Sequence, residues 1–214
     1  MARPLAADHD DKRGAILKAS AVLFARNGFD RTSTAEIAAA CGVSKALLYH
    51  YFDTKEQVLV AIIRQHLEDL VAAVTTADDV LLPPRQRLHA LVSALLDAYR
   101  DADCEHKIQI NELARLDPGI TAELIELERV LVRRFSAALV IALPRLKEAP
   151  DVIKPVTMTV FGMLNWNYMW FRDDGRISRA QYADLVTDLI IGGADQAVEQ
   201  FSAQQAGGPR IRPL

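Results

Sequence analysis

The stretch that decides the fold is TAEIAAACGVSKALLYHYF, residues 34–52. Ser33 and Glu36 form a capping box at its start, in which each side chain accepts the backbone N–H of the other residue, so a helix should begin directly after the serine. Gly42 ends this helix, because glycine tolerates the left-handed conformation that a sharp turn requires. Ser44 then caps a second helix. The stretch therefore predicts two short helices joined by a tight turn.

A helix, a glycine turn and a second helix place a recognition helix in the major groove of DNA. Tyr49, His50 and Tyr51 follow one another in the second helix. Successive helix residues differ by about 100° around the axis, so at least two of the three must be exposed. Exposed aromatic residues beside Lys45 and Lys55 suit contacts with phosphates and base edges. The alternative is that Tyr49 and Phe52 belong to the core and that the other residues of the helix are solvated.

Composition and charge limit the class of protein. The chain has 214 residues, half of them hydrophobic, which is enough to form a sizeable core. Residues 1–67 hold nine Lys/Arg and seven Asp/Glu, a charge of +2, whereas the remainder carries −5, which gives the total of −3. This balance excludes a strongly basic coat for non-specific nucleic-acid binding. DNA affinity must then come from individual contacts and from two half-sites.

The sequence contains no signature of an enzyme, a metal site or a membrane segment. It lacks the GxSxG, P-loop, HExxH and GxGxxG patterns, so we expect no catalytic residues and no cofactor. Cys41 and Cys104 fall on different predicted helices without CxxC spacing, which argues against a disulfide or a metal site. We find no signal peptide and no apolar run of about 20 residues, so we expect a soluble, cytoplasmic protein that does not enter a membrane.

The whole chain is predicted to be all-α, with about nine helices, because no segment alternates between apolar and polar residues as a strand would. Residues 1–9 should form a loose arm and residues 205–214 a disordered tail. Prolines 83 and 84 mark the strongest break in the chain, and we expect one domain over 10–70 and another over 75–204. The predicted helices span residues 12–28, 34–41, 45–51, 54–74, 85–101, 104–115, 118–142, 152–172 and 179–204.

Residues 32–34, 37–38, 42–45, 48–52 and 55–56 closely resemble the DNA-binding domain of TetR-type transcriptional regulators. The resemblance covers about residues 10–70, with the helix-turn-helix motif at about 33–52. Alanine and leucine at positions 46 and 47 depart from the commoner residues of the family. Carried over by position, the DNA-contacting residues would be Ser33, Thr34, Lys45, Leu47, Tyr49, His50, Tyr51 and Lys55.

This resemblance implies how the protein would work. A homodimer, usually a repressor, would bind a palindromic operator in double-stranded DNA through its first three helices. A fourth helix would connect them to a larger domain that binds a small-molecule effector and that forms the dimer through the last two helices. A competing hypothesis of another class is a helical adaptor that binds a peptide or a lipid.

Residues 161–178 resemble the acyl-CoA-responsive branch of the same family. Together with the N-terminal residues, they are most similar to phenylacetyl-CoA-responsive repressors of phenylacetate catabolism. The resemblance implies phenylacetyl-CoA as the effector, and the alternative is a repressor of fatty-acid degradation released by medium- or long-chain acyl-CoA.

Two segments carry the residues that we expect at the effector. Trp166 and Trp170 stand at i and i+4 of one predicted helix and share a face with Met163. Ordinary core and dimer packing would explain these residues as well. The predicted helix over 104–115 is unusually polar, which suits ligand contacts or, equally, a solvated face. The predicted ligand-binding residues are Tyr99, His106, Gln109, Arg115, Phe135, Asn165, Trp166, Tyr168 and Trp170.

Overall fold

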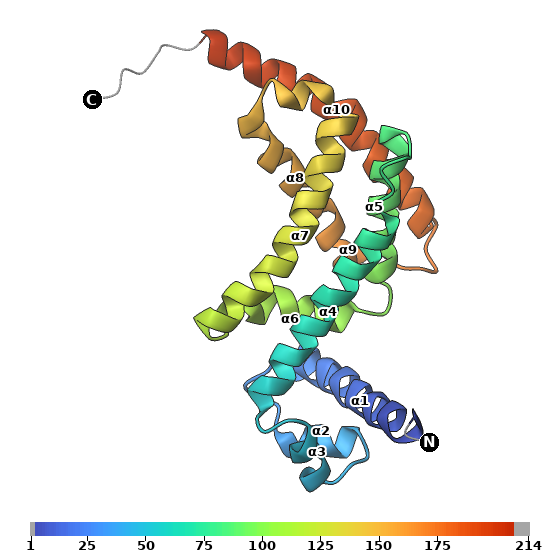
Figure 1. Cartoon of the computed structure of the whole chain (residues 1–214), viewed down its shortest axis with the longest axis vertical. Helices are drawn as coiled ribbons and strands as arrows, with labels where there is room; N and C mark the ends of the chain where they lie inside the picture. Colours follow the sequence, from blue (N-terminus) through green and yellow to red (C-terminus); the bar gives the residue numbers. More distant parts are fainter. Residues whose placement is uncertain (1–2, 208–214) are drawn as a thin grey trace, which may run out of the picture. The chain divides into compact units, whose positions relative to one another are not determined.

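The structure is a computed structural model that describes residues 3–207 (Figure 1). Every regular element in this range is a helix, so the predicted all-α class is confirmed. None of the described helices is long and apolar enough to cross a membrane. The elements are α1 (Arg3–Asn27), α2 (Thr34–Ala40), α3 (Lys45–Tyr51), α4 (Lys55–Ala77), α5 (Pro84–Ala98), α6 (Asp103–Glu112), the 3-10 helix η1 (Leu113–Arg115), α7 (Pro118–Ala142), the 3-10 helix η2 (Pro144–Lys147), α8 (Pro150–Asn165), α9 (Asn167–Trp170) and α10 (Arg179–Gly207).

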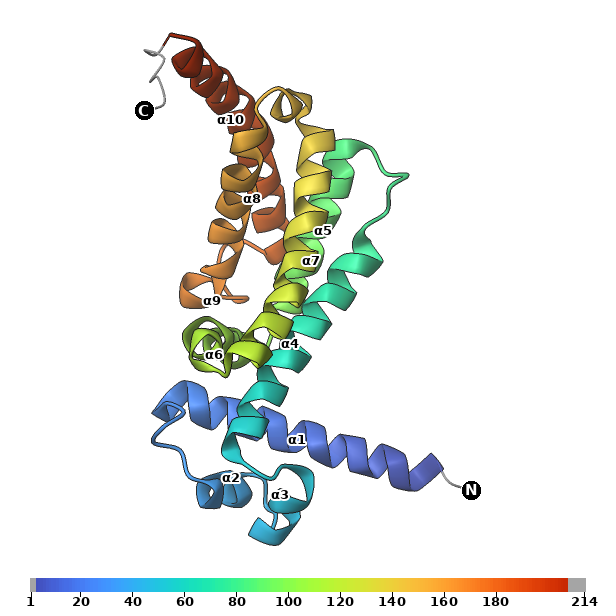
Figure 2. The same ribbon diagram turned by 60° about the vertical axis from the view of Figure 1, so that its left-hand side comes forward.

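The chain divides into two compact units, each made of two segments. The first unit holds the residues up to Asp69 together with Tyr99–Leu127, and the second holds Leu70–Ala98 and the residues from Glu128 onward. The first unit thus includes α6, which the sequence placed with the C-terminal domain. Helix α6 lies beside α1 (Figure 2), and the Nζ of Lys107 donates a 2.9 Å hydrogen bond to the Ala25 carbonyl.

One apolar core holds the first unit together. Ile16, Ile37 and Leu48 come from α1, α2 and α3 and are at most 1% exposed. Ile63 of α4 and Ile108 of α6 join the same cluster. Apolar burial is the main stabilising term of such a core, at roughly 25 cal/mol per Å². The two short helices, which would be unstable alone, are fixed on this support.

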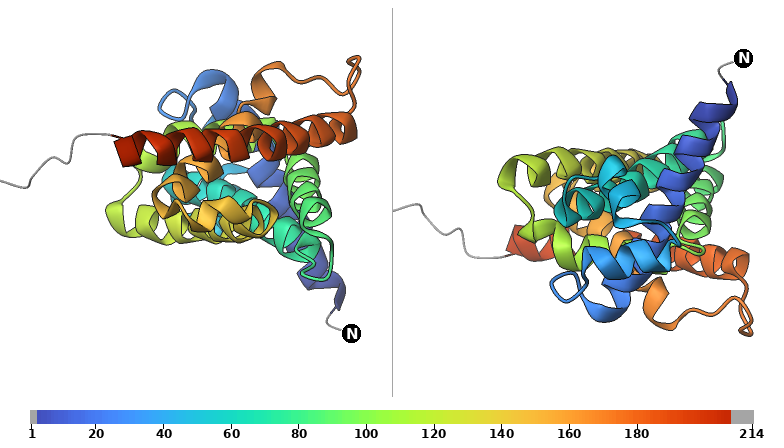
Figure 3. Two further views of the ribbon diagram at one scale, coloured as in Figure 1. Left: turned by 90° about the horizontal axis from the view of Figure 1, so that it is seen from above. Right: turned by 90° about the horizontal axis from the view of Figure 1, so that it is seen from below.

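Helix α10 lies beside α5, α8 and η2 in the second unit (Figure 3). Leu91 of α5, Val160 of α8 and Val186 of α10 are at most 1% exposed. Phe135 of α7 is fully buried, and its ring centroid lies 5.0 Å from that of Phe161 of α8. The core of this unit is therefore built from side chains of four long helices.

Two predictions about the chain ends are wrong. Helix α1 begins at Arg3, so residues 3–9 of the expected loose arm are helical. Pro4 lies in the first turn, where the N–H that proline lacks has no intrahelical partner, and no helix breaker follows before Gly14. Helix α10 continues to Gly207, so the expected disorder of residues 205–207 is also wrong, and residues 208–214 lie outside the described residues.

The predicted single helix over 152–172 is interrupted at Trp166, which separates α8 from α9. Its φ and ψ of −81° and −1° tighten the chain, and the Met169 N–H donates a 3.1 Å hydrogen bond back to its carbonyl. Asn165, Trp166 and Asn167 all have lower helix propensity than alanine or leucine, which favours a break here. The structure also shortens two other predicted helices: α5 ends at Ala98, and α6 gives way to η1 at Leu113.

Candidate nucleic-acid interface and effector residues

The predicted capping box fixes the start of α2. The Ser33 N–H donates to Glu36 Oε2 at 2.7 Å, and the Glu36 N–H donates to Ser33 Oγ at 3.2 Å. The hydrogen bond from the Ser33 backbone lowers the pKa of the Glu36 carboxyl, and the Ser33 hydroxyl lowers it further. Both side chains thereby bind N–H groups that would otherwise lack partners at a helix start.

The turn between α2 and α3 depends on Gly42. Its φ is +65°, in the left-handed region that glycine adopts without strain. The Val43 N–H donates to the Ala38 carbonyl at 3.0 Å, which closes the turn. Ser44 Oγ then accepts the Leu47 N–H at 3.1 Å and caps α3, as the sequence predicted.

Helix α3 has one apolar face and one exposed face. Leu48 is 1% exposed and Phe52, directly after the helix, is 6% exposed, so both belong to the core. Lys45 and His50 are exposed, and the Tyr49 side chain is 46% exposed. The alternative that Tyr49 is a core residue is therefore wrong. The exposed face presents an ammonium, a phenol and an imidazole, which suit phosphates and base edges.

Tyr49 also connects the two helices. Its hydroxyl lies 3.3 Å from the Thr34 hydroxyl at the start of α2. This contact orients the phenol beside the N-terminal turn of α2, where backbone N–H groups favour an anion such as a phosphate. Ser33, Thr34 and Tyr49, three of the residues expected at DNA, are thus brought together.

Helix α1 contributes His9, a residue that sequence reasoning assigned to the loose arm. Its ring centroid lies 4.6 Å from that of Tyr51 and 6.4 Å from that of His50. Tyr51 is half-buried and also meets His50 edge to face at 5.5 Å. The signal that could have identified His9 is the absence of a helix breaker between Leu5 and the following apolar pattern.

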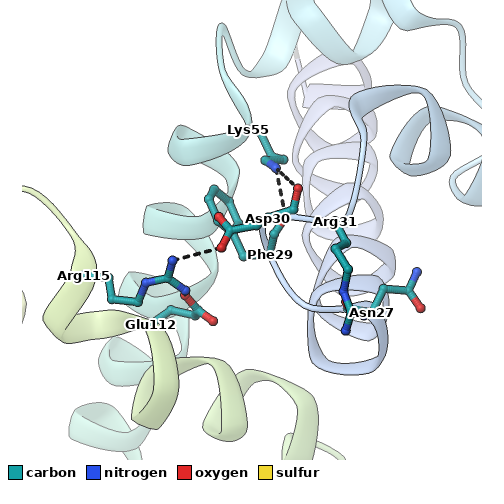
Figure 4. A network of polar contacts seen from close by, with 7 residues as sticks. All are labelled: Asn27, Phe29, Asp30, Arg31, Lys55, Glu112 and Arg115. Atoms are coloured by element: carbon teal, nitrogen blue, oxygen red, sulfur yellow. Dashed lines mark hydrogen bonds and ion pairs between the residues drawn. The ribbon is translucent and has the colours of Figure 1, made fainter.

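Lys55 is placed differently from the other predicted DNA contacts. Its Nζ donates to the Phe29 carbonyl at 2.8 Å and to the Asp30 carbonyl at 3.4 Å (Figure 4). The same ammonium lies 4.3 Å from the centroid of the Phe29 ring. Lys55 therefore holds the loop between α1 and α2, and its charge is directed into the protein.

Arg115, predicted at the effector, lies in the first unit and pairs with the same loop. Its Nη2 donates to Asp30 Oδ2 at 2.9 Å and its Nη1 to Glu112 Oε2 at 2.9 Å (Figure 4). The hydrogen bond from Arg115 lowers the pKa of the Asp30 carboxyl, and the arginine charge adds to that effect. The geometry links η1 to the loop between α1 and α2.

Three more of the predicted effector residues also lie in the first unit. Tyr99 and His106 are at most 4% exposed, and their ring centroids are 4.4 Å apart. Gln109, one turn further along α6, is 9% exposed. His66 of α4, which sequence reasoning did not single out, lies with its Nε2 3.3 Å from His106 Nδ1. A polar cluster is thus buried in the first unit.

The remaining predicted effector residues lie in the second unit and are differently exposed. Phe135 is in the core, whereas Asn165 and Tyr168 are half-buried. Trp166 and Trp170 are 56% and 54% exposed. The break at Trp166 means that the expected shared helical face does not form. The Trp166 ring stacks with Tyr168 at 6.1 Å.

Asp78, directly after α4, is the centre of a buried ion-pair network. Its Oδ1 accepts Arg87 Nε at 2.7 Å, and its Oδ2 accepts Arg134 Nη1 at 2.8 Å. Burial alone would raise the pKa of this carboxyl, but the hydrogen bonds and charges of the two arginines outweigh burial and lower it. The network joins the end of α4 to α5 through Arg87 and to α7 through Arg134.

Two family models match the chain. The model described as "Bacterial regulatory proteins, tetR family" matches residues 16–62, which include α2 and α3. The model described as "Tetracyclin repressor-like, C-terminal domain" matches residues 81–194. Together they cover both the candidate DNA interface and most of the helices that follow.

Similar proteins include a transcriptional activator and a transcriptional repressor. The transcriptional activator FasR of Mycolicibacterium smegmatis is 36% identical over 88 residues, 41% of this chain and 40% of that protein. The transcriptional repressor KstR2 of the same organism is 23% identical over 194 residues, 87% of this chain and 92% of that protein.

Solved structures share both the fold and part of the sequence. A TetR-family regulator from Bordetella parapertussis superposes with a TM-score of 0.75 at 32% identity, over 85% of this chain and 94% of that one. AibR, solved in complex with isovaleryl coenzyme A and operator DNA, superposes with a TM-score of 0.69 at 28% identity, over 83% of this chain and 97% of that one.

Proposed function

This chain belongs to the tetR family of bacterial regulatory proteins, so it is a transcriptional regulator and not an enzyme, and from that premise we propose that it is a dimeric repressor released from a palindromic operator by an acyl-CoA. The observation that carries the DNA-binding part is the exposed face of α3, with Lys45, Tyr49 and His50 held on a capped, closed turn. Leu48 and Phe52 fix the opposite face in the core. Rigid support of this kind is what direct reading of base edges requires.

Exposed apolar residues on α8 and α10 support assembly of the dimer through these two helices. Met158 of α8 is 47% exposed, and Leu185 and Leu189 of α10 are 45% and 58% exposed. A Cβ added at Gly192 or Gly193 would meet nothing within 4 Å in the single chain. Small residues beside exposed apolar ones suit close packing of a helix from a second copy.

An acyl-CoA is our proposal for the effector. AibR, a relative of the same fold at 28% identity, has been solved with isovaleryl coenzyme A and operator DNA, which favours a thioester here. Phenylacetyl-CoA is the first choice because aromatic residues gather on α7, α8 and α9 of the second unit, and an aromatic pair contributes about 0.5–1.5 kcal/mol beyond area burial. Release by phenylacetyl-CoA would make this a regulator of phenylacetate degradation genes. A medium- or long-chain fatty acyl-CoA, with control of fatty-acid degradation, is the second candidate.

Release then follows from thermodynamic linkage. An effector that binds more tightly to the DNA-free dimer must weaken operator affinity by the same factor. Helix α4 takes part in both units, since the boundary between them falls at Asp69 and Leu70. It is therefore our candidate for the element whose two positions the ligand and the operator favour differently.

A gel-shift comparison tests the effector. The protein is bound to its operator and titrated in parallel with phenylacetyl-CoA, palmitoyl-CoA, isovaleryl-CoA, free phenylacetate and free coenzyme A. We expect release by phenylacetyl-CoA at concentrations at which free phenylacetate and coenzyme A leave the complex intact. Release by palmitoyl-CoA alone would select the second candidate. Release by free phenylacetate, or by none of the thioesters, would contradict the acyl-CoA proposal and leave the operator-binding proposal standing.

A further inference from the structure

Asn167 is a buried amide with an unused donor in the second unit. The residue is 2% exposed, and its Nδ2 has no hydrogen-bond partner in the part of the chain that the structure describes. A buried amide donor without an acceptor costs free energy of about 1–3 kcal/mol. A ligand that supplies an acceptor would remove this cost.

The position of Asn167 would ordinarily hold an apolar residue. Val160 and Leu164 of α8, which precede it in the chain, are apolar and fully buried. The neighbours Trp166 and Trp170, by contrast, are more than half exposed. The chain thus turns its amide inward and its indoles outward, the reverse of what apolar burial alone would favour.

A neutral acceptor suits the Asn167 donor. The backbone carbonyl of Asn167 accepts the Phe171 N–H at 2.9 Å, whereas the side-chain Nδ2 has no partner among the described residues. Arg179, whose guanidinium lies 5.0 Å from the centroid of the Phe171 ring, is paired with Asp173 at 2.8 Å and bonded to the Leu96 carbonyl. It does not supply the cation that a buried carboxylate needs. A carbonyl oxygen fits the donor without that requirement.

We propose that Asn167 is a specificity-determining ligand contact, whose Nδ2–H donates a hydrogen bond to the carbonyl oxygen of the acyl group. The proposal rests on the proposed acyl-CoA effector and names the atom of that ligand that the protein recognises. It also separates the polar contact from the aromatic ones. Discrimination between ligands would then depend more on the buried Asn167 than on Asn165, Trp166 and Trp170.

A pair of ligands isolates this hydrogen bond. Phenylacetyl-CoA carries the thioester carbonyl, whereas the thioether S-(2-phenylethyl)-CoA keeps the ring and the coenzyme but lacks that oxygen. Dissociation constants for both are measured by calorimetry on the full-length protein and on Asn167→Leu, which keeps roughly the side-chain size. Thr159→Leu, at an exposed position of α8 outside the predicted ligand-binding residues, serves as the control.

We expect the wild-type protein to prefer the thioester over the thioether by about tenfold, the equivalent of one hydrogen bond. Asn167→Leu should abolish that preference, while Thr159→Leu keeps it. Operator affinity in the absence of ligand should be unchanged. The ligand-free melting temperature of Asn167→Leu should equal or exceed that of the wild type, because an unpaired buried donor has been removed.

Either of two results would overturn the role of Asn167 while leaving the acyl-CoA effector standing. One is an unchanged thioester preference in Asn167→Leu; the other is a melting temperature several degrees lower, which would show that the amide is bonded within the protein. If that variant does not fold, Asn167→Ala provides the same comparison. A wild-type protein that binds neither ligand would instead overturn the acyl-CoA effector itself, and the two failures are therefore distinguishable.

Discussion

At the scale of single residues, His66 of the first unit has a strongly lowered pKa. Burial lowers its pKa to about 3, and the neighbouring His106 contributes to the shift. The two imidazoles lie 3.3 Å apart at His66 Nε2 and His106 Nδ1, so one donates and the other accepts while both are neutral. Protonation of His66 would place positive charge in the same buried cluster as Tyr99.

This shift predicts how stability depends on pH. The folded pKa of His66 is depressed below the unfolded value of 6.5, so the unfolded chain binds more protons between these values. The contribution of His66 is fully present above pH 6.5 and is lost as the pH falls toward 3. Between pH 7 and 5.5 it should decline by about 1 kcal/mol. Urea denaturation at fixed protein concentration measures it, and Asn or Gln at position 66 should flatten the profile by that amount. Equal profiles for wild type and His66→Gln would contradict the assignment.

Replacing Gly42 by alanine should destabilise the protein, whereas the same replacement at Gly14 should stabilise it. Because the φ of Gly42 is +65°, Gly42→Ala forces a side chain into the left-handed region and should destabilise the protein by about 1 kcal/mol or more. Gly14, inside α1 with no atom within 4 Å of an added Cβ, is the matched control. Gly14→Ala should stabilise by about 0.5–1 kcal/mol, because alanine is the better helix former. Chemical denaturation of both variants tests the pair, and a change of the same sign in both would count against the role of the turn.

At the scale of helices and loops, two lysines that the sequence treated alike have different roles. Lys45 is exposed on α3, whereas Lys55 binds the Phe29 and Asp30 carbonyls. Lys45→Ala should weaken operator binding by about 1–3 kcal/mol and leave the denaturation midpoint unchanged. Lys55→Ala should lower the midpoint, because it frees two carbonyls of the loop between α1 and α2. Anisotropy titrations and urea denaturation curves on both variants test these two roles. A Lys55→Ala protein as stable as the wild type would contradict the structural role of Lys55.

The sequence could predict local structure but not the direction of long side chains. Caps and turns depend on neighbouring residues, so Ser33, Gly42 and Ser44 were enough to predict α2 and α3. Ser178 and Gln181 likewise cap α10 with reciprocal hydrogen bonds of 3.2 and 2.9 Å. The direction of a long side chain depends instead on what lies opposite it. The partner of Lys55 is 26 residues away along the chain, and no local pattern specifies such a contact.

The effector residues were harder to predict for the same reason. Whether Trp166 is exposed or buried depends on a helix break that propensity favours only weakly. Asp78 lies in a loop, and its partners Arg87 and Arg134 come from two other helices, so no local pattern indicates the network. The unused donor of Asn167 likewise becomes visible only in the tertiary structure.

At the scale of the whole molecule, the proposed dimer rests on the exposed apolar residues of α8 and α10. Leu189→Glu places a charge at a residue of α10 that is 58% exposed and should convert the dimer to a monomer. Leu81→Glu, at a loop residue that is 89% exposed, is the control and should leave the dimer intact. Sedimentation equilibrium distinguishes them. A Leu189→Glu protein that remained dimeric would place the interface on another surface.

We expect the protein to recognise one palindromic DNA sequence as a dimer. Selection from a randomised DNA pool, followed by anisotropy titration at physiological salt, measures this recognition. We predict a selected sequence with two-fold symmetry, two chains bound per site, and an affinity at least about a thousandfold above that for a scrambled duplex. Equal affinity for the selected and scrambled duplexes, or no enriched sequence at all, would contradict the account.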